Sequence, residues 1–391
     1  MDGSRARFIP VAMPKSPGRQ LLAELLAQGN KPAAYSVMME RTLRSGKHQG
    51  TDTNMPEAES GRGRISGRGN DDTVLSNGPG DDRLAGASGH DTVDLSNASV
   101  RGSVFTANGF ETIHRHGGQV DTYTNIEEIR FLDGRMVFDA NDPAAQVVRL
   151  YQAALARAPD QAGLNFWVGQ LERGGRLSDL GEAFIRSPEF AARFGASGDA
   201  AYVDRLYQNV LGRAGDSAGR AFWTGQLQAG ASRQDVLAGF SESGENKAGT
   251  QATVAAGIWD RSETAVQVAR LYDTVLGRLP DAGGLAFWRG KLDDGSAKLE
   301  DVAGALTRST EFEARYGAPG NRDFVESLYR NTLGRAGDDG GTGYWTQQLD
   351  RGGLSRVGVV TSFSESAEHA ARTAPQFASD DPARYGVALA G

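Results

Sequence analysis

The chain of 391 residues contains no cysteine and only 5 histidines. Without cysteine it can have no disulfide framework, no thiolate metal site and no cysteine nucleophile. Residues 1–20 lack the apolar core of a cleaved signal peptide, and no apolar run approaches the ~18 residues that a membrane-spanning helix needs. We therefore expect no transmembrane segment, and either a cytoplasmic protein or one exported by a machinery that reads a signal elsewhere in the chain.

The motifs of common catalytic centres are missing as well. The chain has no HExxH zinc-protease helix, no GxSxG nucleophile elbow, no Walker loop and no strand-flanked GxGxxG. The histidines are scattered, and carboxylate pairs such as Asp71/Asp72 and Asp293/Asp294 are adjacent in sequence, so their side chains point apart. These absences favour a protein that is not an enzyme.

Basic residues are outnumbered, with 42 Lys and Arg against 49 Asp and Glu, and the formal net charge is -7. A protein that binds nucleic acid needs a basic field, so this balance argues against a nucleic-acid partner and favours cations or solubility instead. Glycine is abundant, at 52 residues. The length allows about two to four domains, each large enough to bury a core.

Between Gly61 and Asn97, glycine, aspartate and asparagine surround isolated aliphatic residues. The aliphatic residues recur at intervals of nine, ten and nine positions, at Ile65, Val74, Leu84 and Val93. Glycine permits the left-handed backbone of a tight turn, aspartate can place a carboxylate over that turn, and the next aliphatic residue lies in a short strand and points inward. The pattern predicts a short parallel β-roll with capping strands over residues 61–140.

Two segments, GPGDDRLAG and GASGHDTVD, resemble the Gly-Gly-x-Gly-x-Asp-x-aliphatic-x nonapeptide of the hemolysin-type (RTX) calcium-binding repeat. In that family two nonapeptides form one coil, and calcium lies between a turn and the equivalent turn one coil later. The resemblance implies that Asp72 and Asp91 lie on one side of the coil and Asp82 on the other. It also implies Ca²⁺ as the bound ion, with about six to eight oxygen ligands from carboxylates and turn carbonyls. The candidate calcium-binding residues are Gly67, Gly69, Asp71, Asp72, Gly78, Gly80, Asp81, Asp82, Gly89 and Asp91.

The sequence departs from the family pattern in three respects. The spacing between Asp72 and Asp91 carries one extra residue, the leading glycine is missing from two units, and Ala87 stands where the third unit should have glycine. The pattern therefore predicts one or two weak calcium sites. A Gly/Asp-rich loop without calcium is the alternative.

Residues 103–139 alternate apolar and polar side chains and predict further strands over 103–106, 120–124, 126–131 and 135–138. The last two are joined through Asp133-Gly134, a strong hairpin signal, and the group would cover the open end of the roll. His114 and His116 would share one face of a strand and could bind a metal. Because no third ligand is apparent, exposed strand histidines are the favoured interpretation.

Beyond Asn141 the sequence repeats itself four times, each time with the helical spacing of apolar residues. The repeats begin with Leu-Tyr at Leu150, Leu206, Leu271 and Leu328. The first and third continue into Arg-Ser-x-Glu-Phe, whereas the second and fourth continue into Phe-Ser-Glu-Ser-x-Glu, so the duplicated unit is a pair. We expect a leader over residues 1–60, helical pairs over residues 141–262 and 263–374, and a tail over residues 375–391.

Each repeat places the same residue types at its helix boundaries. Helix-capping aspartates, each followed three residues later by a glycine that lets two helices approach closely, are predicted at Asp160, Asp216, Asp281 and Asp338. Capping serines, each with a glutamate suited to the helix dipole two residues later, are predicted at Ser187, Ser243, Ser309 and Ser366. The predicted apolar anchors are Phe166-Trp167, Phe222-Trp223, Phe287-Trp288 and Tyr344-Trp345. The arginines expected to bond helix-end carbonyls or the capping aspartate are Arg157, Arg213, Arg278 and Arg335.

On these residues, about 143–374, the repeats resemble a tandem helical module of secreted bacterial proteins that is known only as a domain of unknown function. That module often lies beside hemolysin-type repeats and is distantly similar to the linker domain of phycobilisomes. The resemblance carries no catalytic residue. The expected fold class is therefore α+β multidomain, with a short parallel β-roll and capping strands followed by a mainly α-helical tandem-repeat region.

Together these features predict a secreted, non-enzymatic calcium-binding protein of the cell surface or extracellular matrix. The resemblance to hemolysin-type proteins implies the type I secretion machinery as a partner and an uncleaved C-terminal signal, a role for which residues 373–391 are suitable in composition. The helical repeats would bind a surface or matrix component or mediate self-association. The alternatives are an intracellular linker-like scaffold and the non-catalytic C-terminal part of a secreted hydrolase.

Overall fold

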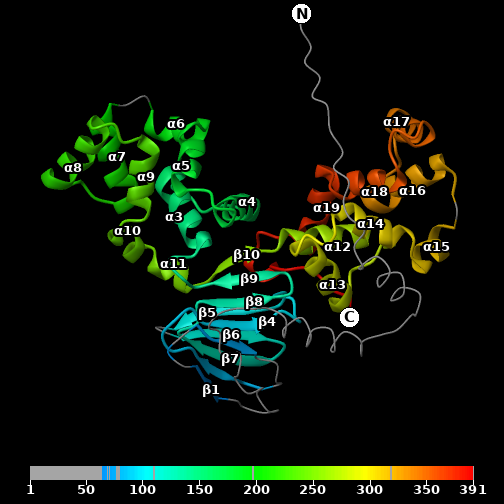
Figure 1. Ribbon diagram of the computed structural model, residues 1–391, viewed down its shortest axis with the longest axis horizontal. Coiled ribbons are helices and arrows are strands. Elements are labelled where there is room, and N and C mark those ends of the chain that lie inside the picture. Colours follow the sequence, from blue (N-terminus) through cyan, green and yellow to red (C-terminus); the bar gives the residue numbers. More distant parts are fainter. Residues whose placement is uncertain are drawn as a thin grey trace, which may run out of the picture. The chain divides into compact units, whose positions relative to one another are not determined.

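The computed structural model describes residues 64–67, 69, 71–75, 80–108, 111–195, 198–317 and 319–390. All of these residues belong to one of the two units of the chain, Asp52–Gly391. The leader expected over residues 1–60 lies outside the described residues. A strand region with mixed sheets precedes a mainly helical region (Figure 1), which confirms the expected order of the two classes of structure.

The strand region contains two five-stranded sheets. In spatial order, the first sheet consists of β1 (Arg64–Ser66), β3 (Arg83–Ala85), β7 (Gln119–Thr124), β6 (Glu111–His116) and β5 (Val104–Asn108). The second consists of β10 (Ile258–Arg261), β9 (Gly134–Val137), β8 (Glu128–Phe131), β4 (Thr92–Leu95) and β2 (Thr73–Leu75). The first four strands of the chain therefore alternate between the two sheets.

Parallel pairing joins the strands that carry the aliphatic repeat. Ile65 in β1 pairs with Leu84 in β3, and Val74 in β2 pairs with Val93 in β4. The same parallel pairing continues from β3 to β7 and from β4 to β8, whereas the remaining pairs are antiparallel. Ile65, Leu84 and Val93 are buried and form one core with Tyr123. Ile65, Leu84 and Val93 thus point inward as predicted, because each occupies the same place on successive strands.

The hairpin predicted at Asp133-Gly134 is present, because β8 and β9 are antiparallel neighbours on either side of it. Strand β10 was not predicted. β10 lies at the end of the segment expected to be the first helical pair, and it pairs antiparallel with β9. Trp259 of this strand is buried in the core of the strand region. Its ring packs edge-on against that of Phe131, with the ring centroids 6.2 Å apart. Residues 258–261 are therefore part of the second sheet, where they cover the edge that β9 would otherwise expose.

The helices form two bundles, each with its own apolar core. The first bundle comprises α3 (Pro143–Leu155), α4 (Gln161–Glu172), α5 (Leu177–Ile185), α6 (Pro188–Phe194), α7 (Asp199–Leu211), α8 (Ser217–Gln228), α9 (Arg233–Ser241), α10 (Gly244–Gly249) and α11 (Gln251–Ala255). The second comprises α12 (Glu263–Leu276), α13 (Ala282–Asp293), α14 (Leu299–Thr307), α15 (Thr310–Tyr316), α16 (Asn321–Leu333), α17 (Asp339–Asp350), α18 (Arg356–Ser364) and α19 (Ala367–Phe377), followed by the 3₁₀ turn η1 (Pro382–Arg384). Two consecutive repeats share each core. None of the helices within the described ranges has the length and apolar character needed to cross a membrane.

The predicted caps are present in all four repeats. The four aspartates each accept a hydrogen bond from the backbone N–H of the glycine three residues later, as Asp160 does from Gly163 at 2.7 Å. The four serines cap α6, α10, α15 and α19 in the same way. A Cβ atom on Gly163 would lie only 2.4 Å from the Tyr151 hydroxyl oxygen, and the equivalent glycines are equally close to a tyrosine. These glycines therefore do allow the close approach that the sequence predicts.

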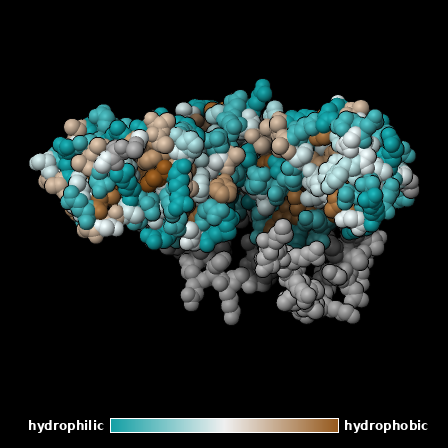
Figure 2. Space-filling view, turned by 90° about the horizontal axis from the view of Figure 1, so that it is seen from above, coloured by the Kyte–Doolittle hydropathy of each residue, from teal (hydrophilic) through white to brown (hydrophobic). Residues whose placement is uncertain are grey.

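The aromatic pairs are only partly core residues. Phe166, Phe222 and Tyr344 are 56%, 56% and 54% exposed, so the prediction that they act as apolar anchors is wrong. The tryptophan beside each of them packs against the core instead. Neighbouring residues on an α-helix point about 100° apart, so only one member of each pair can face the bundle interior. On the face shown in Figure 2 the surface is mainly hydrophilic, with small apolar patches between the polar side chains.

The segment expected to be a C-terminal tail is attached to the rest of the fold. Val387 is buried, its backbone N–H donates to Asp133 Oδ2 at 2.7 Å, and its carbonyl accepts from Ser99 Oγ at 3.0 Å. The Arg101 guanidinium donates to the Gln376 carbonyl at 2.8 Å. The Ala390 N–H donates to the Pro280 carbonyl, and Val387 belongs to the core of the second bundle. The last described residues therefore pack onto both the strand region and the second bundle.

Candidate metal centre

Three chain turns are stacked on one side of the strand region, at the β1–β2, β3–β4 and β7–β8 connections. The Asp72 backbone N–H donates to Asp91 Oδ1 at 3.0 Å, and the Asp91 N–H donates to Glu127 Oε2 at 2.7 Å. Backbone bonds run alongside, from Thr92 N–H to the Asp72 carbonyl and from Glu127 N–H to the Asp91 carbonyl. Two hydrogen bonds thus join each turn to the one before it. The carboxylate of the later turn accepts one of them, and a backbone carbonyl of the earlier turn accepts the other. The structure therefore brings Asp72 and Asp91 together.

A similar arrangement holds the opposite side. The Asp82 N–H donates to Asp121 Oδ1 at 3.0 Å, and the Val120 N–H donates to Asp81 Oδ1 at 2.9 Å. Asp82 therefore lies on the opposite side from the Asp72–Asp91 stack. Its partner there is Asp121 on β7, the strand that pairs with β3. Asp121 lies outside the Gly/Asp segment of residues 61–97, so the sequence pattern did not identify it, although Gly117-Gly118 precede it.

The candidate residues differ strongly in burial. Asp72, Asp82 and Asp91 are buried, Gly67, Gly80 and Asp81 are half-buried, and Gly69, Asp71 and Gly89 are exposed. Gly78 lies outside the described residues. The buried carboxylates are therefore the ones that face the interior of the stacked turns, whereas Asp71 lies on the outside, where its Oδ1 accepts the His90 N–H.

Glycine is required at the turns because a carboxylate occupies the space of a side chain. A Cβ atom on Gly67 would lie 2.6 Å from Asp72 Oδ2, and one on Gly86 would lie 2.3 Å from Asp91 Oδ2. The Asn125 carbonyl oxygen is even closer to the Gly86 position, at 2.0 Å. Gly86 thus faces two oxygen atoms from successive turns.

The third turn of the stack has no Gly/Asp repeat, and sequence reasoning missed it. Asn125 has a positive φ of 51°, so it takes the backbone conformation that glycine favours elsewhere. Glu127 then supplies the carboxylate, and burial raises its pKa, although the Asp91 backbone N–H partly offsets this effect. An Asn-x-Glu sequence after an alternating strand is the signal that could have identified this turn.

The buried carboxylates of these turns and their backbone carbonyls could bind a cation through oxygen atoms. Such a donor set suits a hard divalent ion such as calcium. The residues present therefore fit Ca²⁺ in chemistry.

The helical repeats contain a second recurrent cluster, built from a tyrosine, an arginine and a glutamate. The Arg157 guanidinium stacks over the Tyr151 ring, with its Cζ atom 5.3 Å from the ring centroid. It also donates two hydrogen bonds to the Glu189 carboxylate, at 2.8 and 3.1 Å. The same arrangement recurs at Arg213–Glu245, Arg278–Glu311 and Arg335–Glu368. As predicted, each arginine also donates to a backbone carbonyl, that of the residue after it, and two of them lie within 4.0 Å of the capping aspartate. The sequence analysis did not identify the glutamate, which accepts two hydrogen bonds from each arginine. Because both charges are paired within each repeat, the cluster joins two helices rather than forming an open ligand site.

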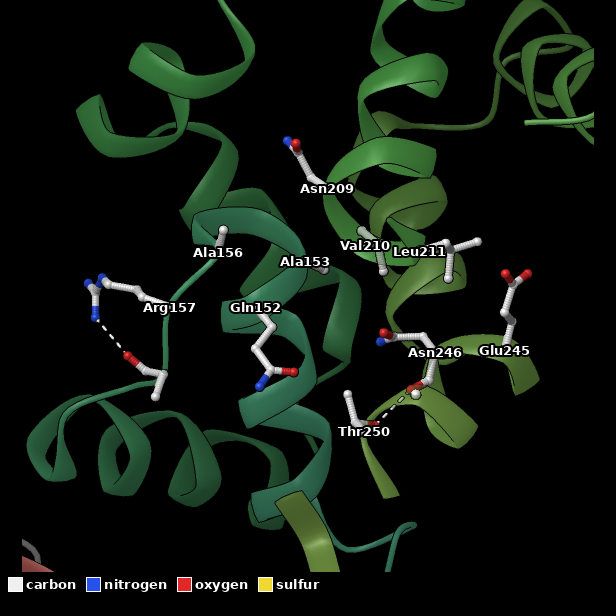
Figure 3. A pocket seen from close by; sticks show the side chains of 12 residues that line it. Gln152, Ala153, Ala156, Arg157, Asn209, Val210, Leu211, Glu245, Asn246 and Thr250 are labelled. Atoms are coloured by element: carbon white, nitrogen blue, oxygen red, sulfur yellow. Dashed lines mark hydrogen bonds between the residues drawn. The ribbon is translucent and has the colours of Figure 1, made fainter. Parts of the chain in front are cut away.

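A pocket of about 520 Å³ lies in the first bundle between α3, α7 and α10 (Figure 3). Arg157 and Glu245 are among its lining residues, but each is paired outside the pocket, with Glu189 and Arg213. The Asn246 side-chain amide donates to the Ser241 carbonyl at 2.8 Å. The residues that line this pocket do not combine a nucleophile with a neighbouring base, so it offers no arrangement typical of acid–base or nucleophilic catalysis.

The structure thus defines a tandem helical-repeat protein attached to a small strand region with stacked, carboxylate-rich turns. A family model described as a domain of unknown function (DUF4214) matches residues 141–179, 181–250, 260–315 and 303–373. The chain belongs to this family, and the four matches confirm the four tandem repeats predicted from the sequence. No curated protein matches the chain.

Proposed function

We propose that this is a secreted, non-enzymatic calcium-binding protein whose strand region is a short parallel β-roll of the hemolysin type. The observation that carries the proposal is the placement of Asp72, Asp91 and Glu127, one in each of three stacked turns and joined by hydrogen bonds from turn to turn. Parallel pairing of β1 with β3 and of β2 with β4 supports the β-roll.

Calcium would act by offsetting the repulsion among these carboxylates. Asp72 and Asp91 would hold it on one side and Asp82 on the other, in each case together with turn carbonyls. An ion that binds only the folded turns stabilises them by mass action. The strand region would therefore be least stable in the calcium-poor cytosol and most stable outside the cell, where calcium is millimolar.

Secretion through the type I machinery and residence at the cell surface or in the extracellular matrix complete the proposal. The resemblance of the Gly/Asp segments to hemolysin-type repeats supports this secretion route. The helical repeats would bind a surface component or a second copy of the chain. Phe166, Phe222 and Tyr344, which are more than half exposed at equivalent places in three repeats, support such a surface.

The calcium test uses the full chain after treatment with a chelator. Calorimetric titration with Ca²⁺ should show binding at submillimolar to millimolar concentration, with a rise in the melting temperature of the strand region. Mg²⁺ should bind much more weakly because it requires a smaller, octahedral site. A chain that shows neither heat of binding nor a shift in melting temperature would overturn the calcium assignment and favour the intracellular scaffold.

Two matched variants locate the site. Asp91→Asn removes a carboxylate from the stack, whereas Asp94→Asn makes the same change on β4, where the side chain bonds the Ser96 N–H instead. We expect calcium affinity to fall about tenfold or more in the first variant and to stay unchanged in the second. Equal affinities in both variants would contradict the proposed ligands, and circular dichroism without calcium checks that both variants fold.

Localisation is tested separately, by antibody detection of the chain in culture medium and in cell fractions of its native host. Accumulation in the medium that disappears when the type I exporter is inactivated supports secretion. Retention inside the cell contradicts it, whatever the outcome of the calcium titration.

A further inference from the structure

A chemically different group of ligands lies on strands β6 and β7 of the first sheet. His114 and His116 are two residues apart on β6, so they project from the same face. Asp121 of β7 is the direct cross-strand partner of His114. The sequence offered no third ligand for the two histidines, because Asp121 joins them only through the antiparallel pairing of these strands.

The three side chains converge on one point. Asp121 Oδ2 lies 3.0 Å from His116 Nε2 and 3.8 Å from His114 Nδ1, and the ligand atoms of all three residues lie within 4.8 Å of one another. Tetrahedral Zn²⁺ with bonds of about 2.0–2.1 Å places its ligand atoms about 3.3–3.4 Å apart. The observed separations from Asp121 bracket that value, so small side-chain rotations would suffice to bind an ion.

His114 is not the exposed strand histidine that the sequence favoured. It is 1% exposed, and its ring is stacked between those of Phe105 and His116, with ring centroids 4.5 and 4.4 Å away. Its Nε2 is 2.8 Å from Ser103 Oγ. A hydrogen bond from Nε2–H to Ser103 leaves the Nδ1 lone pair directed towards Asp121, which is how outer residues orient a metal-binding imidazole.

Asp121 is oriented in the same manner. Its Oδ1 accepts the backbone N–H of Asp82, which leaves Oδ2 as the oxygen that faces both imidazoles. The Tyr123 hydroxyl lies 3.3 Å from Oδ2 and 3.1 Å from His114 Nδ1, beside the same point. The His116 side chain is 35% exposed, so an ion and a water molecule can reach the cluster from solvent.

We propose that His114, His116 and Asp121 bind a divalent transition-metal ion of the Zn²⁺ type, with a water molecule at the fourth position. Imidazole nitrogen suits zinc, nickel and copper, whereas calcium takes oxygen ligands. This site is therefore distinct from the turns proposed for calcium, although Asp121 links the two through Asp82. With Tyr123 as its neighbour, Asp121 keeps a hydrogen-bond donor when the metal is bound.

The test uses the full chain, stripped with a chelator and kept in millimolar Ca²⁺, so that its result does not depend on whether the turns bind calcium. Calorimetric titration should show one equivalent of Zn²⁺ bound at micromolar concentration or tighter. Co²⁺ should give the visible absorption of a four-coordinate site with nitrogen and oxygen ligands. Failure to bind Zn²⁺ at micromolar concentration would overturn the proposal.

His116→Ala and His90→Ala form the matched pair of variants. His90 also lies close to a carboxylate, with Asp139 Oδ2 at 3.6 Å, but is not part of the cluster. We expect His116→Ala to weaken Zn²⁺ binding about tenfold or more and to abolish the Co²⁺ spectrum, whereas His90→Ala should change neither. Because His116 is partly exposed, its variant should melt like the parent without metal. Unchanged Zn²⁺ affinity in His116→Ala, or equal loss in both variants, would refute the assignment.

Discussion

The close contact between a helix glycine and a tyrosine hydroxyl gives the sharpest test of the repeat architecture. Gly284 lies in the first turn of α13, and a Cβ atom there would be 2.4 Å from the Tyr272 hydroxyl oxygen. Tyr272 is buried in the core of the second bundle, so its ring cannot swing aside freely. Gly284→Ala should therefore destabilise the bundle.

The magnitude follows from two opposing effects. Replacing glycine with alanine inside a helix gains about 1 kcal/mol, whereas forcing an extra methyl group into a packed site costs about 1–3 kcal/mol. The net change for Gly284→Ala is thus a loss of up to about 2 kcal/mol. Gly290 lies in the same helix with no atom within 4 Å of its Cβ position, so Gly290→Ala should stabilise the bundle by about 0.5–1 kcal/mol.

Urea unfolding followed by tryptophan fluorescence measures both variants, because Trp288 packs in the same bundle. A double-mutant cycle with Tyr272→Phe adds a second readout. Removing the hydroxyl should relieve the clash, with a coupling energy of about 1 kcal/mol or more between positions 272 and 284. If Gly284→Ala stabilises the bundle as much as Gly290→Ala, or if Tyr272→Phe gives no relief, the close-packing argument is wrong.

Three further predictions follow from buried charges and from the chain terminus. Arg149 is fully buried and bonds Glu242 at 2.7 and 2.6 Å, so Arg149→Met should cost the first bundle about 3 kcal/mol in urea unfolding, because it leaves Glu242 without this partner. Burial, with the charge of His116 adding to it, lowers the pKa of His114 from 6.5 to about 3, so the unfolded chain binds a proton that the folded chain does not. Metal-free protein should therefore lose stability as the pH falls from about 6.5 to 3, by up to about 4–5 kcal/mol, and His114→Gln should flatten this dependence. Arg101→Ala removes the bonds to the Gln376 and Gly386 carbonyls, so amide exchange in residues 378–390 should become faster, and unchanged exchange would show that these contacts do not hold the segment.

Features set by near neighbours in the chain could be predicted from the sequence. The capping aspartates and serines each bond a backbone group three residues away, so the pattern alone identifies them. The aliphatic positions of the strand region follow the same logic, because Ile65 and Leu84 occupy equivalent places in a repeat of regular length. The order of strand and helical regions and the pairing of the repeats were predictable for this reason.

Features that join distant segments required the tertiary structure. Residues 258–261 form a strand because the edge of β9, more than a hundred residues earlier, is open to pair with them. Asp121 meets His114 through strand pairing, and Glu127 enters the stack of turns without any glycine repeat. The sequence by itself determined the local units, since their hydrogen bonds span a few residues. Only the tertiary structure decided which units meet, because burial and pairing between distant segments depend on the whole fold.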